Sequence, residues 1–124
     1  MKLRLRGNSL RLRLTQREVN DLVAVGSVEE KTAFGPGASL SYAIALGEVP
    51  TVGASFDAGA IRVTVPFAEA RAWATSDRVG IEAEQATATA GEPLRLLIEK
   101  DFACLKPRTG EDDRDAFPNP NPTC

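Results

Sequence analysis

The stretch KLRLRGNSLRLRLTQREV, residues 2–19, determines how the start of this chain folds. Residues 2–6 and 10–14 alternate strictly between leucine and a basic residue. A period of two is typical of a β-strand, because successive side chains point to opposite faces of a sheet. The intervening residues 7–9, Gly-Asn-Ser, favour a turn. The sequence therefore predicts an antiparallel hairpin with leucines on one face and basic residues on the other.

A short helix is expected directly after this hairpin. Thr15 is followed three residues later by Glu18, which is the pattern of a capping box, and the apolar positions that follow suit a helix ending near Gly26. Two further strands are predicted over residues 28–34 and 39–46. This part of the chain thus reads as a β-β-α-β-β unit.

The same order of elements recurs downstream. Strands are predicted over residues 51–57 and 60–65, and Pro66 suits the first position of a second short helix. Strands over residues 79–85 and 93–99 complete a second β-β-α-β-β unit.

An offset of 51 residues aligns the two units without a gap. Leu10 then corresponds to Ile61, Glu18 to Glu69, and the alignment continues until Val28 corresponds to Val79. We interpret this as an internal duplication, with repeats 2–46 and 51–99. The predicted fold is a strand-rich α+β fold, in which tandem β-β-α-β-β units form a swapped-hairpin-like, pseudo-dimeric barrel with two short helices.

Length and composition suit one compact domain. The chain has 124 residues, of which 43% are hydrophobic and 26% are charged, and its net charge is −2. We expect a single domain over residues 1–106 and an extended, acidic Pro/Asn-rich tail over 107–124. Charge is uneven, because residues 1–24 carry a net charge of +4.

Several classes of function are disfavoured by what the sequence lacks. It contains no histidine, so Ser-His-Asp and Cys-His nucleophile systems and histidine-ligated metal sites are excluded. Residues 35–37, Gly-Pro-Gly, lack the spacing of a phosphate-binding loop and are read as a turn. An enzyme that acts through carboxylates is the least favoured alternative, because no pair of Asp or Glu residues stands out from surface acids. We therefore predict a non-enzymatic protein with no cofactor and no metal site. No apolar run is long enough to cross a bilayer, and the expected location is the cytoplasm, with no membrane partner.

The two cysteines, Cys104 and Cys124, leave their redox state open. They are compatible with a disulfide, with free thiols, or with metal binding together with Asp112 or Asp115. Two thiolates without histidine are too few ligands for a closed zinc site within one chain.

Two stretches resemble the MazE and AbrB class of swapped-hairpin domains. They are GNSLRLRLTQREV at residues 7–19 and IRVTVPFAEARAWATSDRVGIEAE at residues 61–84, where Pro66 stands at the junction of strand and helix. In that class two units interleave their hairpins, normally as a dimer. The resemblance implies that the tandem chain is a monomeric internal pseudo-dimer, or a dimer. The whole chain, including LIEKDFACL at residues 97–105, also resembles a family of small bacterial proteins with no assigned function.

The basic side of the first hairpin is the candidate DNA-binding face. If the leucines face inward, the outward side carries Lys2, Arg4, Arg6, Arg11 and Arg13. Arginine suits phosphate groups, and the MazE and AbrB resemblance implies an antitoxin-like or regulator-like protein that contacts double-stranded DNA here. Alternatively these residues only solvate an outer face and pair with acids such as Glu29 and Glu30.

The second repeat does not duplicate this charge. Gly53, Ser55 and Asp57 stand at the positions of Lys2, Arg4 and Arg6 in the offset alignment, and Thr64 stands at that of Arg13. Any DNA contact is therefore expected to be one-sided.

The acidic tail is the alternative interaction surface. Asp112, Asp113, Asp115 and Phe117 suit binding of a protein partner, as the tails of MazE-like antitoxins do, and the chain would then have no nucleic-acid role. The competing interpretation is a solubilising end, or a strap that Phe117 packs onto the domain.

Overall fold

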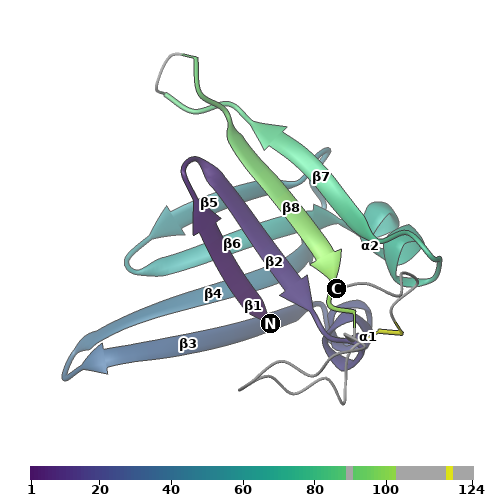
Figure 1. Ribbon diagram of the computed structural model, residues 1–124, viewed down its shortest axis with the longest axis horizontal. Helices are drawn as coiled ribbons and strands as arrows, with labels where there is room; N and C mark the ends of the chain where they lie inside the picture. Colours follow the sequence, from purple (N-terminus) through teal and green to yellow (C-terminus); the bar gives the residue numbers. More distant parts are fainter. Residues whose placement is uncertain (89–90, 103–116, 119–124) are drawn as a thin grey trace.

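The computed structural model describes residues 1–88, 91–102 and 117–118. Two helices and eight strands in these residues follow the predicted order (Figure 1). Their bounds are β1 Lys2–Arg6, β2 Ser9–Leu14, α1 Gln16–Val25, β3 Ser27–Gly35, β4 Ala38–Gly47, β5 Gly53–Asp57, β6 Ala60–Pro66, α2 Phe67–Ala74, β7 Gly80–Gln85 and β8 Leu94–Lys100.

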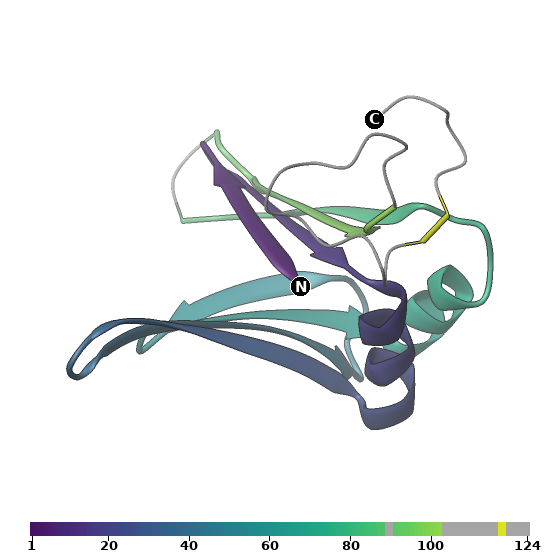
Figure 2. The same ribbon diagram turned by 60° about the horizontal axis from the view of Figure 1, so that its bottom comes forward.

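The strands form two four-stranded sheets. Sheet A has the order β1-β2-β8-β7, and sheet B has the order β3-β4-β6-β5. The two central pairs, β2 with β8 and β4 with β6, are parallel, whereas every hairpin is antiparallel. Each sheet therefore combines one hairpin from each repeat, which is the predicted exchange of hairpins. Figure 2 shows the sheets as two layers with both helices at one end.

The predicted barrel is not closed. In the described residues no ladder of backbone hydrogen bonds joins sheet A to sheet B. At the edge where β7 meets β5, the amide of Gln85 takes the place of a neighbouring strand: its Oε1 accepts from the Ala54 N–H at 2.6 Å and its Nε2 donates to the Ala54 carbonyl at 2.9 Å. Because these two backbone groups are occupied, the ladder cannot continue from β5 into β7 at this point.

The hairpins and helices of the repeats confirm the offset of 51. Lys2 lies opposite Arg13 in the first hairpin, and Gly53 lies opposite Thr64 in the second. The residues buried on α1 are Val19 and Leu22, and those buried on α2 are Ala70 and Trp73.

The expected match of Val28 with Val79 is wrong. Val28 pairs with Ile44, and the equivalent pair in the other sheet is Ile81 with Ile98, so Val28 corresponds to Ile81. The chain passes from α1 to β3 through Gly26 alone, in the left-handed conformation that caps the helix. Residues 75–79 separate α2 from β7, and this longer connection shifts the second repeat by two residues.

The core lies between the inner faces of the two sheets and the helices. Alternation places Leu10, Leu12 and Leu14 of β2 inward, all at most 5% exposed. Helix α1 begins with the predicted capping box, in which Thr15 and Glu18 exchange hydrogen bonds. The largest fully buried side chains are Trp73, Leu12, Leu14, Leu22, Ile44, Ile81, Ile98, Val19, Val63 and Val65.

Candidate binding surfaces

The five basic residues of the first hairpin share one outer face of sheet A. Lys2 lies directly opposite Arg13, and Arg4 lies opposite Arg11, while Arg6 lies opposite Ser9 at the turn. Residues directly opposite one another in an antiparallel pair point to the same side. Lys2, Arg4, Arg6, Arg11 and Arg13 are called the basic strip below.

Acidic residues of β8 and its end partly neutralise the basic strip. The Nε atoms of Arg13 and Arg11 lie 2.7 and 3.4 Å from Oε1 of Glu99. The Nζ of Lys2 lies 3.1 Å from Oδ2 of Asp101, whose side chain is only 7% exposed. Parallel pairing of β2 with β8 places Glu99 beside Arg13, which a reading of the hairpin alone could not show.

The pairing with Glu29 and Glu30 is not observed. Glu30 instead accepts a hydrogen bond from the Tyr42 hydroxyl at 2.8 Å and lies 3.2 Å from the amino group of Met1. Within the described residues, Arg4 and Arg6 have no acidic partner. The end of the basic strip near the β1–β2 turn is therefore the part whose charge is not offset.

The basic strip has no counterpart in sheet B. The second hairpin has the same register, with Ser55 opposite Arg62 and Asp57 opposite Ala60. Arg62 alone repeats a basic residue of the first hairpin. The basic residues of the hairpins therefore cluster on the outer face of sheet A and not on that of sheet B, as the offset alignment predicts.

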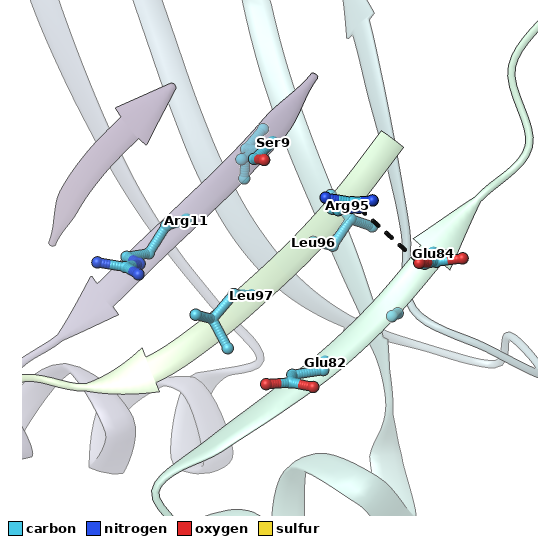
Figure 3. A pocket seen from close by; sticks show the side chains of 9 residues that line it. Ser9, Arg11, Glu82, Glu84, Arg95, Leu96 and Leu97 are labelled. Carbon is cyan, nitrogen blue, oxygen red and sulfur yellow. Dashed lines mark ion pairs between the residues drawn. The ribbon is translucent and has the colours of Figure 1, made fainter. Parts of the chain in front are cut away.

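A shallow trough of about 450 Å³ crosses the outer face of sheet A beside the basic strip (Figure 3). Leu97 of β8 lies between Arg11 on β2 and Glu82 on β7. Arg95 and Glu84 form a long ion pair of 3.9 Å across β8 and β7. The face is therefore basic along β1 and β2 and acidic along β7.

An apolar groove of about 470 Å³ lies between the inner faces of the sheets. Most of its lining residues come from strand ends next to hairpin turns, whereas Ala54 lies at the start of β5, away from the β5–β6 turn. They are Leu5, Leu10, Leu40, Ala54, Ser55, Phe56, Ile61, Gln85 and Leu94. The sequence pattern marked the inward leucines as core, but it held no signal that this end of the core is uncovered.

Comparison with known proteins places the chain in a family. A family model matches residues 1–121. The chain belongs to DUF7009, a family of unknown function. No curated protein and no solved structure matches the chain. The MazE and AbrB resemblance therefore stays a prediction.

The described part of this DUF7009 chain contains no group of three or more Cys, Asp or Glu side chains that could hold a metal ion. None of its described helices is both long and apolar enough to cross a membrane. Of the predicted tail and thiol residues, Asp112, Asp113, Asp115, Cys104 and Cys124 lie outside the described residues.

Phe117 lies against the domain, as in the strap interpretation. Its N–H donates to the Asp101 carbonyl at 2.8 Å, and its ring packs edge-to-face on Phe102 with centroids 5.8 Å apart. The ring also lies 5.2 Å from the Nζ of Lys100. These contacts occupy the side chain that the sequence offered for a partner.

Lys100 is a buried lysine that was not predicted from the sequence. Lys100 is 5% exposed, and its Nζ donates to the Ser76 carbonyl at 2.7 Å and lies 6.0 Å from the centroid of Trp73. Burial lowers the pKa of Lys100, although the carboxylate of Asp77 opposes this. Alternation from Leu96 through Ile98 to residue 100 is the signal that predicts an inward side chain at this position.

Proposed function

We propose that this protein is a non-enzymatic DNA-binding protein that contacts the phosphates of double-stranded DNA through the basic strip. One observation carries the proposal: Lys2, Arg4, Arg6, Arg11 and Arg13 share one outer face, and the two at its end, Arg4 and Arg6, have no acidic partner among the described residues. Guanidinium groups match phosphate geometry. The MazE and AbrB resemblance supports the same assignment.

The geometry favours phosphate contact over reading of bases. Neighbouring strands are about 4.8 Å apart, so four strands span roughly 14 Å before side chains are added. A major groove is about 12 Å wide and admits a two-stranded ribbon. Since β2 is bonded to β8, the β1–β2 hairpin is not free to enter the groove alone, and Glu82 and Glu84 make the β7 side repel DNA.

The charges set the expected salt dependence. Within the described residues, the five basic side chains face two carboxylates, those of Glu99 and Asp101, which leaves about three positive charges for phosphates. Three phosphate contacts give a slope of about −2.7 for log K against log salt. The affinity is then expected to fall roughly 40-fold between about 50 and 200 mM salt.

The test is fluorescence anisotropy with a labelled duplex of random sequence at several salt concentrations. Arg4→Glu with Arg6→Glu is expected to abolish binding. Arg17→Glu with Arg62→Glu is the matched control, because it reverses two exposed arginines on α1 and on the outer face of sheet B. The control protein is expected to retain binding and its salt slope.

Two outcomes would refute the proposal. One is the absence of binding by the native protein even at the lowest salt concentration. The other is an equal loss of affinity in both double variants, because that would reflect total charge and not the basic strip.

A further inference from the structure

The apolar groove is built from equivalent residues of the two repeats. In the register of the strands, Leu5 corresponds to Phe56 and Leu10 to Ile61 at an offset of 51, and Leu40 corresponds to Leu94 at an offset of 54. The groove therefore lies on the pseudo-twofold axis that relates the repeats. The apolar inner faces continue beyond the core at this end, where neither α1 nor α2 covers them.

The amide of Gln85, one of the two polar side chains among the lining residues, is already hydrogen-bonded. Both amide atoms of Gln85 are used by the backbone of Ala54, so β7 and β5 are clamped together on one side. In the same register Thr32 corresponds to Gln85, and its short side chain has no clamp of this kind. The groove thus has a closed side at β5 and β7, and its occupant gains affinity from apolar contact.

The exposed apolar area of the groove distinguishes between two kinds of occupant, a second copy of the chain and a small molecule. Leu5 is 59% and Phe56 is 68% exposed. A large side chain presents roughly 150–250 Å² when fully exposed, so these two offer about 250 Å². With the half-buried lining residues the total is about 400 Å², half of the roughly 800 Å² that each partner buries in a stable protein complex.

The volume, in contrast, suits a small ligand. Ligand sites of about 300–1,000 Å³ with mostly apolar walls are typical of proteins, and the groove holds about 470 Å³. We propose that the apolar groove binds a small, uncharged apolar molecule. The groove lies on the inner faces of the sheets, whereas the basic strip lies on an outer face. The proposal of a ligand site is therefore independent of the proposal of DNA binding.

The test uses N-phenyl-1-naphthylamine, a small neutral dye whose fluorescence rises in apolar surroundings. The native protein is expected to bind one dye molecule per chain. Ala54→Phe places a ring in the groove and is expected to weaken binding at least tenfold. Phe56→Ser removes one wall and is expected to weaken binding as well, which provides a second variant if the first is poorly folded.

Phe34→Ser is the matched control. Phe34 is 70% exposed, almost the same as Phe56, but it does not line the groove. This variant is expected to bind the dye like the native protein. Fluorescence of the single tryptophan, Trp73, reports whether each variant is folded.

Three results would overturn the inference. The first is dye fluorescence with the native protein that does not exceed that of buffer. The second is an equal loss of binding in Phe34→Ser and Phe56→Ser, which would indicate general surface adhesion. The third is sedimentation as a native dimer that Ala54→Phe converts to a monomer, which would show that a second copy occupies the groove.

Discussion

Replacing the buried Lys100 by methionine is expected to stabilise the protein. The substitution removes the hydrogen bond to the Ser76 carbonyl, which contributes about 1.5–3 kcal/mol as a bond to a charged group. It also removes the contacts with the rings of Trp73 and Phe117, each worth about 0.5–1 kcal/mol at an exposed site and about 2 kcal/mol when desolvated. Against these stands the cost of burying the ammonium group, which is several kcal/mol.

The lowered pKa of Lys100 has the direction expected from this burial cost. Burial is the largest cause of the shift, which means that the charged form gains less from its neighbours than it loses by leaving water. Methionine has a similar length and an apolar side chain that suits the core. We expect a gain of about 1 kcal/mol in the free energy of unfolding, or roughly 3–6 °C in Tm.

The pH dependence provides a second readout. Because the pKa of Lys100 is lower in the folded protein than its ordinary value of 10.5, the unfolded chain binds more protons between those two values. The stability of the native protein therefore rises with pH in that window. The advantage of Lys100→Met is expected to shrink as the pH approaches 10.5.

Urea unfolding followed by the fluorescence of Trp73 measures both effects. Lys31→Met, at an exposed lysine of β3, is the control and is expected to leave stability unchanged within about 0.5 kcal/mol. The reasoning is refuted if Lys100→Met destabilises the protein at neutral pH. It is also refuted if its advantage does not depend on pH.

Three further perturbations test other parts of the fold. Burial and the Glu30 carboxylate raise the pKa of Tyr42 from 10.0 to about 12. The stability of the native protein is therefore expected to fall as the pH rises between these values, because the folded chain then binds more protons than the unfolded chain. Tyr42→Phe is expected to remove that fall, as measured by urea unfolding at several pH values. Ala58 has a φ of +50° in the β5–β6 turn, so Ala58→Asn is expected to raise stability by about 1 kcal/mol, and an unchanged urea midpoint would contradict this. Gln85→Ala leaves two backbone groups of Ala54 without partners and is expected to cost about 1–2 kcal/mol, with faster amide exchange at Ala54 as the specific readout.

Local features of the fold could be predicted because short-range physics determines them. The alternation of leucine and arginine specified β1 and β2, and the spacing of Thr15 and Glu18 specified the start of α1. The duplication followed from the same patterns. The two-residue shift before β7 could not be predicted, because Val79 and Ile81 both fit the apolar pattern as the equivalent of Val28. Only the pairing of Ile81 with Ile98 in the structure shows that Ile81 is the equivalent residue.

Long-range features could not be predicted in the same way. Glu99 is 86 residues from Arg13, and nothing in either stretch announces the parallel pairing that brings them together. The apolar groove could not be predicted from the sequence for another reason. Alternation shows which face of a strand is apolar, but it does not show whether another element covers that face.

The strand β1 has two faces with separate consequences. Arg4 and Arg6 point outward, while Leu5 between them lines the groove. As an edge strand, β1 also needs charged residues to prevent pairing with other chains. Glutamate serves that purpose as well as arginine, so Arg4→Glu with Arg6→Glu keeps the edge protected. Loss of DNA affinity in that variant, with an unchanged sedimentation coefficient, would therefore report lost phosphate contact and not association of the chains.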